Sequence, residues 1–415
     1  MIQTSPEASA SSVAGAEWFR RAGVQALFAA LGREGHEARI VGGALRNTLL
    51  GLPVSDVDFA VTALPAEVMR FAGEAGLKSV PTGIDHGTIT IVVEGVPYEV
   101  TTLRQDVETH GRHATVAFTR DWAADAARRD FTMNALYAAA DGRVLDPLGG
   151  LDDLRARRIR FINSARDRIR EDYLRILRFF RFTAEYAAGA PDPEGLAACI
   201  SERAGLARLS PERIRAELLR ILVARGPMAA IEPMMETGLL TSLLGGVTYP
   251  GHFARVAEIE VGLSLPPAPI RRLAALAARI EEDAARLTAR LRLSNAEAAR
   301  LGVMAAREPA IWREMGDVLS KQVLYRLGGE RFRDRVLIAW AKSADGKADA
   351  AWRRLSQLPD LWTPPRFPVN GQDLMARGLK AGPEIGAALR ELEAKWIASD
   401  YALGRDELLR GVERT

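Results

Sequence analysis

Residues 42–65 read GGALRNTLLGLPVSDVDFAVTALP, and this stretch decides the fold of the first part of the chain. Its centre, SDVDFAVTA, has the β-branched and aromatic residues of a buried strand, yet Asp56 and Asp58 stand at its start. Carboxylates are rarely buried without a partner. Side chains two positions apart on a strand point to the same face, so we expect Asp56 and Asp58 to converge.

Two converging carboxylates repel each other, and a divalent cation removes that repulsion. A pair of metal ions can clamp the attacking and leaving oxygens of a phosphoryl transfer, and Mg²⁺ accepts few protein ligands because substrate phosphates complete its coordination. A third carboxylate is expected from a neighbouring strand, and the candidate is Glu99 in PYEVTTLR. We therefore predict Asp56, Asp58 and Glu99 as catalytic residues, with Asp56 and Asp58 as the Mg²⁺ ligands.

The residues before the aspartates favour a metal site over a surface turn, in which Asp-x-Asp is also frequent. Gly42 and Gly43 follow the strand-like ARIV and precede a short helix, ALRNTLLG. Glycine lets backbone amides approach a triphosphate, and a helix start favours anions. Arg46 lies one turn into that helix, within reach of the same phosphates. All three are predicted nucleotide-binding residues; the alternative is a tight turn followed by a surface arginine.

Strand signals are concentrated between residues 38 and 150 and nearly vanish after residue 151. They are ARIVGG, SDVDFAVTA, GTITIVVEG, PYEVTTLR and RVLDP, with the helical segments ALRNTLLG and PAEVMRFAGEAG between them. A helix is also predicted over 17–33. After residue 151 the pattern changes to long amphipathic helices, two of which begin with Ser210 and Ser294 as N-caps. The sequence therefore predicts an α+β head followed by a helical remainder.

Composition restricts the class of protein. A chain of 415 residues is too long for one hydrophobic core, so about two to four domains are expected. A hydrophobic share of 48% and a charged share of 26% are typical of soluble globular proteins. The 56 Lys and Arg exceed the 53 Asp and Glu only slightly, which is weak support for an anionic partner.

The cysteine content and the hydropathy of the sequence indicate the cellular compartment. Cys199 is the only cysteine, so an intramolecular disulfide is excluded and a reducing cytoplasm is expected. The first twenty residues lack the basic start and apolar segment of a secretory signal. No apolar run is long enough to span a bilayer, so no membrane association is expected.

Three further segments, RRDFTMNALY (128–137), LDPLGGLDDL (145–154) and EDYLRILRFFRF (171–182), complete a specific set. Together with residues 42–65, the chain resembles the bacterial-type (class II) tRNA nucleotidyltransferase and poly(A) polymerase family, and most of all its CCA-adding enzymes. The resemblance covers about residues 38–225, and FPVNGQDLM and GLKAGPEIG near the C-terminus look like the family's tail. It implies a polymerase-β-like nucleotidyltransferase head, with a small mixed sheet and helices, before an all-helical neck, body and tail.

The resemblance also implies domain limits and partners. The substrates would be CTP, ATP and the acceptor arm of tRNA, which is recognised by shape and phosphates; no protein partner is evident. The expected parts are a disordered N-terminus (1–16), the head (17–150), a base-reading neck (151–225), a body (226–305) and a tRNA-binding tail (306–415).

Further site residues follow from the resemblance alone. Arg129 in RRDFT would contact the nucleotide, and Asn134 would lie beside its ribose. One departure is Asn47, where the family usually has Asp; it is therefore left out of the metal ligands. The remaining predicted nucleotide-binding residues belong to the base-reading helix: Asp172, Arg175, Arg178 and Arg181.

Residues 171–182 can also be analysed as an amphipathic helix, whose polar face carries Asp172 and Arg175 as an i,i+3 ion pair. An ordinary surface helix is the alternative. Cytosine and adenine both present an amino donor beside a ring-nitrogen acceptor, whereas guanine and uracil present a carbonyl and an N–H. A carboxylate only accepts hydrogen bonds and a guanidinium only donates them, so this pair matches CTP and ATP.

Residues 101–118 look like the family's mobile loop, although a plain surface loop fits equally well.

The activity that the resemblance implies is template-independent addition of C, C and A to the tRNA 3′ end, with release of pyrophosphate. The alternatives are a poly(A) polymerase, a CC-only or A-only enzyme of the same family, and, from another class, a non-catalytic RNA-binding protein on this scaffold.

Overall fold

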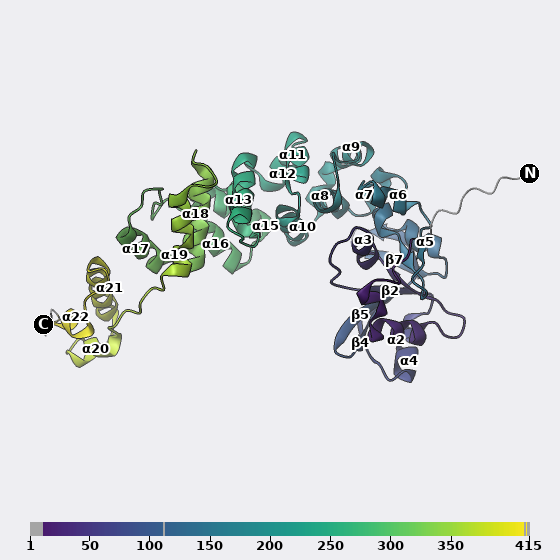
Figure 1. Cartoon of the computed structure of the whole chain (residues 1–415), viewed down its shortest axis with the longest axis horizontal. Helices are drawn as coiled ribbons and strands as arrows, with labels where there is room; N and C mark the ends of the chain where they lie inside the picture. The colour runs from purple at the N-terminus through teal and green to yellow at the C-terminus, as the bar shows by residue number, and fades with distance from the viewer. Residues whose placement is uncertain (1–10, 111–112, 411, 413–415) are drawn as a thin grey trace, which may run out of the picture. The chain divides into compact units, whose positions relative to one another are not determined.

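The computed structural model describes residues 11–110, 113–410 and 412, and its contacts divide the chain into two units, Met1–Leu243 and Leu244–Thr415 (Figure 1). Strands occur only in the first unit among the described residues. No helix in this described part combines the length and the apolar character needed to cross a membrane. The predicted change from an α+β head to helices is confirmed, whereas the finer limits at residues 150, 225 and 305 stay predictions.

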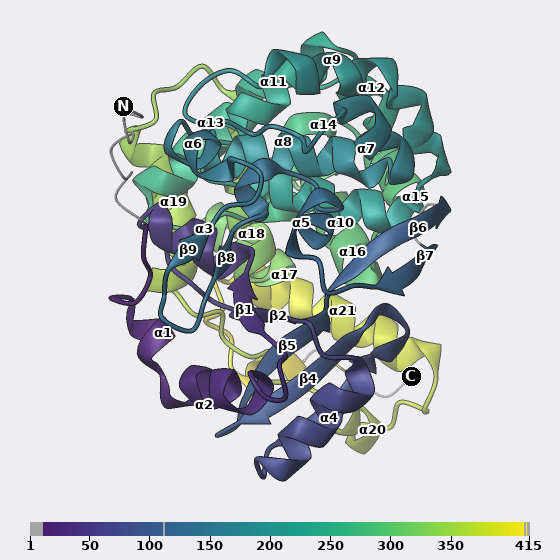
Figure 2. The ribbon, with the colours of Figure 1, turned by 90° about the vertical axis from the view of Figure 1, so that its right-hand side faces the viewer.

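A seven-stranded mixed sheet forms the centre of the head, in the order β3-β4-β5-β2-β1-β8-β9 (Figure 2). β2 and β5 are parallel, and the other neighbours are antiparallel, so the predicted small mixed sheet is confirmed. The strands are β1 (Ala38–Val41), β2 (Asp58–Val61), β3 (Lys78–Gly83), β4 (Thr88–Val93), β5 (Val96–Thr102), β8 (Tyr137–Ala138) and β9 (Val144–Leu145).

The apolar face of the sheet explains the alternation in SDVDFAVTA. Phe59 in β2 is fully buried, and its ring lies 5.1 Å from that of Phe28 in an edge-to-face contact. The covering helices are α2 (Ala22–Leu31) and α4 (Pro65–Glu74), which pack on each other. The short helix α3 (Gly43–Leu49) connects β1 to β2, as predicted.

Three local expectations differ from the structure. The helix predicted over 17–33 is split into α1 (Glu17–Arg20) and α2, because Arg21 has an extended backbone (φ −56°, ψ 136°). β3 was not predicted, since its side chains are mostly exposed and lack alternation. Residues 101–118 hold the end of β5 and a hairpin of β6 (Arg104–His110) and β7 (His113–Phe118) rather than a loop.

The predicted disordered N-terminus is wrong for its last part. Residues 1–10 lie outside the described residues, but Ser12 pairs with Arg143 and Val13 is buried. The backbone N–H of Val13 donates to the carbonyl oxygen of Gly142 at 2.9 Å. This extra pairing with the turn before β9 orders residues that composition alone marks as small and polar.

The rest of the first unit is helical. Ser210 caps its helix as predicted, accepting the backbone N–H of Arg213 at 3.4 Å. The helices are α5 (Trp122–Ala127), α6 (Gly150–Arg155), α7 (Ala165–Glu171), α8 (Leu174–Tyr186), α9 (Pro193–Ser201), α10 (Pro211–Val223), α11 (Met228–Glu236) and α12 (Leu239–Leu244).

The second unit contains only helices among its described residues. Ser294 forms the predicted cap, as part of a capping box with Glu297. The helices are α13 (Pro250–Gly262), α14 (Pro269–Ala277), α15 (Glu281–Leu291), α16 (Asn295–Ala305), α17 (Asp317–Leu327), α18 (Gly329–Lys342), α19 (Ala350–Leu361), α20 (Gly371–Ala376), α21 (Pro383–Ala398) and α22 (Arg405–Leu409).

Gly150 generates a testable prediction about folding. A Cβ on Gly150 would overlap the backbone carbonyl of Thr132, with the carbonyl carbon 2.7 Å away. Gly150→Ala should therefore destabilise the first unit by roughly 1–3 kcal/mol. Gly73→Ala is the matched control, because Gly73 lies within α4 with nothing near its Cβ position, and should stabilise slightly. Urea unfolding checks both, and equal midpoints would contradict the close packing.

Candidate active site

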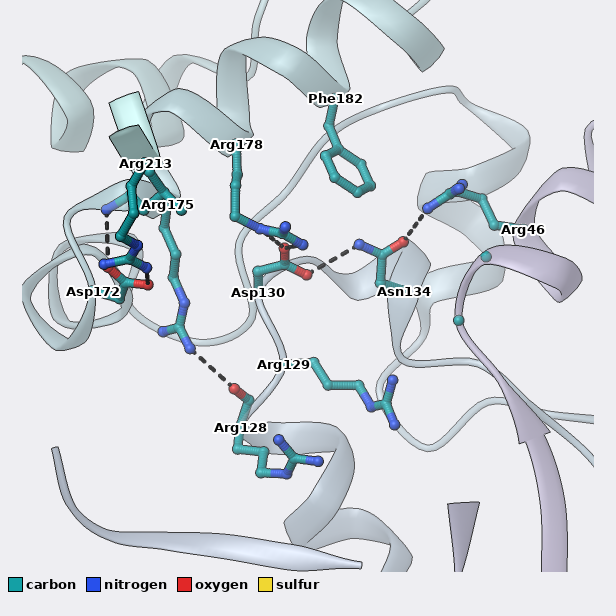
Figure 3. Close-up of a pocket in the computed structure, with 13 residues that line it drawn as sticks. Arg46, Arg128, Arg129, Asp130, Asn134, Asp172, Arg175, Arg178, Phe182 and Arg213 are labelled. Atoms are coloured by element: carbon teal, nitrogen blue, oxygen red, sulfur yellow. Dashed lines mark hydrogen bonds and ion pairs between the residues drawn. The ribbon is translucent and has the colours of Figure 1, made fainter. Parts of the chain in front are cut away.

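One cavity of about 470 Å³ lies between the head and the helices that follow it in the first unit (Figure 3). Its lining brings together residues from α3, from the RRDFT segment and from α8 and α10. They are Gly42, Gly43, Arg46, Arg128, Arg129, Asp130, Asn134, Asp172, Leu174, Arg175, Arg178, Phe182 and Arg213.

At Gly42 and Gly43, which have no side chains, the backbone itself lines this cavity. Gly42 has φ +70°, a conformation that residues with a Cβ rarely adopt. Its Cβ position lies 4.0 Å from Nη1 of Arg129, and that of Gly43 lies 3.7 Å from Nη2 of Arg46. The backbone of this turn therefore faces two guanidinium groups, an arrangement suited to a phosphate chain.

Arg46 is buried, and hydrogen bonds fix its guanidinium group. Its Nη1 donates to Oδ1 of Asn134 at 2.8 Å, and its Nε and Nη2 donate to Oδ1 of Asn47 at 3.1 and 2.9 Å. Its Cζ lies 4.2 Å from the ring centroid of Tyr186, a cation–π contact. Asn47, the departure from the family pattern, thus serves here to orient the arginine.

Asp130 joins the head to α8, and the sequence analysis did not single it out. Its Oδ1 accepts Nδ2 of Asn134 at 3.0 Å, and its Oδ2 accepts Nε and Nη2 of Arg178 at 2.8 and 2.6 Å. Burial opposes ionisation of Asp130, but Arg178 and Asn134 outweigh it and hold its pKa below the usual value. A continuous chain, Arg46–Asn134–Asp130–Arg178, therefore runs along the cavity (Figure 3).

The predicted pair of Asp172 and Arg175 is not formed, and the predicted continuous helix over 171–182 is wrong. α7 ends at Glu171, Asp172 is extended (φ −151°, ψ 107°), and α8 begins two residues later. Aspartate favours such a break because its side chain can accept a local backbone N–H. Oδ1 of Asp172 accepts the N–H of Leu174 at 3.1 Å.

Asp172 and Arg175 bond to other residues instead of to each other. Oδ2 of Asp172 accepts Nη2 of Arg213 in α10 at 2.7 Å. Arg175 forms an ion pair with Glu171 and donates from Nη2 to the carbonyl oxygen of Arg128 at 3.2 Å. The two side chains still line one side of the cavity (Figure 3).

Arg181 is the one predicted nucleotide-binding residue that does not line this cavity. Its Nε donates to Oε2 of the buried Glu217 at 2.6 Å, which fixes α8 against α10. In contrast, Arg128 and Arg213 line the cavity without having been predicted. The signal for Arg128 was its place in RRDFT, for Arg213 its place in SPER, and for Phe182 its place at the end of EDYLRILRFFRF.

Arg129 is oriented by a second unpredicted carboxylate. Asp125 is 1% exposed, and its Oδ2 accepts Nη2 of Arg129 at 3.0 Å and the hydroxyl of Tyr137 at 2.8 Å. Nε of Arg129 is buried and has no partner within the described residues. The atom of this arginine that faces the glycine turn is Nη1, 4.0 Å from the Cβ position of Gly42.

The predicted catalytic carboxylates lie next to the cavity, not in its lining. Asp58 begins β2 opposite Val41, the residue before Gly42. The prediction that both aspartates lie on one strand is wrong for Asp56, which precedes β2 and is exposed; its Oδ2 accepts the hydroxyl of Ser55 at 2.8 Å. Glu99 lies in β5, the parallel neighbour of β2, one residue before the partner of Phe59.

Electrostatics supports the grouping of these carboxylates. Burial, then the charges of Glu99 and Asp56, raise the pKa of Asp58 to about 6, and Arg129 only partly opposes them. No three His, Cys, Asp or Glu residues gather tightly enough to hold a metal by themselves in the part of the chain that is described. The donor set fits a hard divalent cation that two aspartates share with substrate phosphates. Ligation by Glu99 stays a prediction.

Crowding of these carboxylates generates a stability prediction. A folded pKa of about 6 lies above the ordinary value of 3.8, so ionised Asp58 destabilises the fold above about pH 6. The penalty grows between the two pKa values, and it disappears only well below 3.8, where the group is protonated in both states. Asp58→Asn, without metal, should be about 1 kcal/mol more stable than the parent at pH 8, after allowance for partial exposure, and this difference should shrink to a small fraction at pH 4.

Urea unfolding at the two pH values measures this difference. Asp152→Asn serves as a control, because the Asp152 side chain is 84% exposed and, among the described residues, pairs only with nearby Arg155. An Asp58→Asn variant that is less stable than the parent at pH 8 would contradict the repulsion.

Known proteins are similar to this chain in sequence and in architecture. A family profile described as "Poly A polymerase head domain" matches residues 38–160, and one described as "Probable RNA and SrmB- binding site of polymerase A" matches residues 190–249. The mitochondrial CCA tRNA nucleotidyltransferase 1 of Mus musculus is 36% identical over 397 residues, 95% of this chain and 90% of the relative. A CCA-adding enzyme of Levilactobacillus brevis is 30% identical over 384 residues, 91% of this chain and 94% of the relative.

Structural similarity agrees with the sequence matches. A crystal structure of the Bacillus stearothermophilus CCA-adding enzyme in complex with CTP has a TM-score of 0.70 and 27% identity to this chain, and it covers 91% of this chain and 93% of that one. The relatives cover nearly the whole chain, and the predicted resemblance is therefore confirmed. This chain belongs to the CCA tRNA nucleotidyltransferase family, and it is a nucleotidyltransferase.

Proposed function

We propose that this chain adds C, C and A, one nucleotide at a time and without a template, to the 3′ end of tRNA from CTP and ATP, releasing pyrophosphate. One observation carries the proposal: a single cavity joins the glycine turn and Arg46 of the head to Asp172, which precedes α8, and Arg175, in its first turn. Phosphate-binding groups and base-reading groups thus face the same space. The Bacillus stearothermophilus relative was solved with CTP, which supports a nucleotide ligand here.

The chain's own residues would position the nucleotide from both ends. The turn at Gly42 and Gly43, with Arg46 and Arg129, would hold the triphosphate, because guanidinium forks match phosphate oxygens. Asn134, held between Arg46 and Asp130, would meet the ribose. This positioning brings the α-phosphate next to Asp58 and allows in-line attack by the tRNA 3′-hydroxyl.

Mg²⁺ is the metal that we propose for Asp56 and Asp58. When bound, it would lower the pKa of the attacking hydroxyl and neutralise charge on the phosphates. The two carboxylates would share the ion, and Arg46 would stabilise the departing pyrophosphate through its charge. Glu99, on the adjoining strand, is the further catalytic carboxylate in this proposal.

Base selection would use Asp172 and Arg175 in their observed settings. Asp172 accepts bonds from Leu174 and Arg213, and its two oxygens have capacity for one more donor, the amino group of cytosine or adenine. Arg175 is fixed by Glu171 and the carbonyl of Arg128, with N–H groups left to meet the ring nitrogen. Uracil and guanine would present the opposite pattern to both.

Loss of either aspartate should abolish incorporation. Asp56→Ala and Asp58→Ala should each reduce the rate of CTP addition at least about a thousandfold, because the metal would lose half of its protein ligands. The measurement incubates tRNA lacking CCA with labelled CTP and ATP and sizes the products, with circular dichroism to verify folding. Near-parent turnover in either folded variant would overturn the metal assignment.

The same assay on the parent chain separates the competing activities. Three added nucleotides ending in A are expected. Long A tails would instead indicate a poly(A) polymerase, and partial products would indicate a CC-only or A-only enzyme. Absence of addition would indicate a non-catalytic RNA-binding protein.

Asp172→Ala should lose more of its selectivity for CTP over UTP than of its rate of nucleotide addition. We expect the ratio of kcat/KM for CTP over UTP to fall at least about tenfold, because the acceptor that rejects the uracil carbonyl is removed. Asp152→Ala, on an exposed helix position, is the matched control. An unchanged CTP/UTP ratio in Asp172→Ala would rule out the base-reading role.

The proposal includes the cytoplasm as the compartment, on the ground of a single, buried cysteine. The mouse relative is named as mitochondrial, so cell fractionation is the appropriate test. The expected binding partner is the acceptor arm of tRNA.

A further inference from the structure

The second unit gathers cationic side chains where three of its helices pack together. α13, α14 and α18 contact one another, and α13 and α18 lie side by side in Figure 1. His252 lies in the first turn of α13, Arg279 follows α14 by two residues, and Lys342 is the last residue of α18. None of these residues belongs to the candidate active site.

His252 carries a hydrogen-bonding atom without a partner. Its ring stacks on Tyr249, with centroids 5.5 Å apart and planes 20° apart. Cζ of Arg279 lies 5.2 Å from the Tyr249 ring. Nδ1 of His252 is buried and makes no hydrogen bond to any described residue. Because a buried polar atom without a partner is costly, this atom indicates an external ligand.

Positive charges crowd the same place. Burial, Arg279, Lys342 and Arg255 lower the pKa of His252. Burial, then Arg279 and Arg335, lower the pKa of Lys342 to about 8. These directions mean that the surroundings disfavour the positive charge that the cluster itself carries.

Nearby carboxylates do not neutralise the cluster. No ion pair among the described residues includes Arg279 or Lys342. Asp283 is the carboxylate that acts on Lys342 through its charge. It is already engaged, because its oxygens accept Nη1 of Arg286 at 2.6 Å and the backbone N–H of Arg279 at 2.8 Å. An anion from outside the chain would complete the cluster.

We propose that His252, Arg279 and Lys342 form a binding site for a phosphate group of an RNA backbone. Arginine and lysine are the side chains that contact phosphates, and the start of the 13-residue α13 adds the positive end of a helix dipole. RNA is favoured over free phosphate because the segment matched as a probable RNA-binding site, residues 190–249, ends at Tyr249, on which His252 stacks. The choice of tRNA as the probe rests on the proposed function.

The test measures RNA binding by the full chain, without nucleotide, over a series of KCl concentrations. A tRNA transcript lacking CCA is the probe for the parent, Lys342→Gln and Arg279→Gln. Each variant should bind about tenfold more weakly at low salt, and the slope of log affinity against log salt should fall by about one. Lys78→Gln, which removes an exposed charge in β3, is the matched control and should bind like the parent.

Thermal unfolding separates a ligand site from a structural role. Because its neighbours repel Lys342, Lys342→Gln should unfold at the parent temperature or above it, while binding RNA more weakly. Weaker RNA binding together with a lower unfolding temperature would overturn the proposal, as would an unchanged salt slope in both variants.

Inorganic phosphate distinguishes the source of the ligand. If millimolar phosphate raises the unfolding temperature of the parent but not of Lys342→Gln, and the salt slope for RNA is unchanged, the RNA assignment is wrong. The readout requires no catalysis. A chain that binds RNA with the expected slope but adds no nucleotide would refute the proposed function alone, and a chain that adds CCA with unchanged slopes would refute this inference alone.

Discussion

The ion pair between Asp130 and Arg178 joins the strand-bearing head to helix α8, and the candidate active site depends on it. Asp130 is buried, and the cost of removing its charge from water is offset because Arg178, Asn134 and the N–H of Phe131 all donate to its two oxygens. Asn134 in turn holds Arg46. The end of the cavity suited to phosphates and the end suited to a base are therefore parts of one hydrogen-bonded network.

The cavity and the edge of β2 beside it accumulate charge of opposite sign. At the β2 edge, Asp56, Asp58 and Glu99 accumulate negative charge, which raises the pKa of Asp58 and calls for a cation. In the cavity itself, six arginines face two aspartates and call for an anion. A magnesium–nucleotide complex would relieve both accumulations of charge at once. This pairing of unmet charges is the physical basis of the proposed reaction.

A network of distant partners sets the orientation of Asp172 and Arg178, two of the proposed base-reading groups. Asp172 bonds to Arg213, 41 residues away, and Arg178 bonds to Asp130, 48 residues away. Local helix geometry would instead pair Asp172 with Arg175. The observed break between α7 and α8 frees both side chains from that local pair, so that each can face a ligand while a third residue holds it. Such preorganisation reduces the cost of ordering side chains when a nucleotide binds.

The sequence by itself determined the α+β head, the helical remainder, the glycine turn and the strand that begins at Asp58, and its family resemblance indicated eight of the cavity residues. These features are local, since periodicity, turn chemistry and short motifs act over a few residues. Only the tertiary structure decided the roles of Asp130, Asp125 and Arg213, the absence of Arg181 from the cavity and the cationic cluster at His252. Their partners come from elements far apart in the chain, and the packing that brings them together leaves no periodic pattern in any one segment.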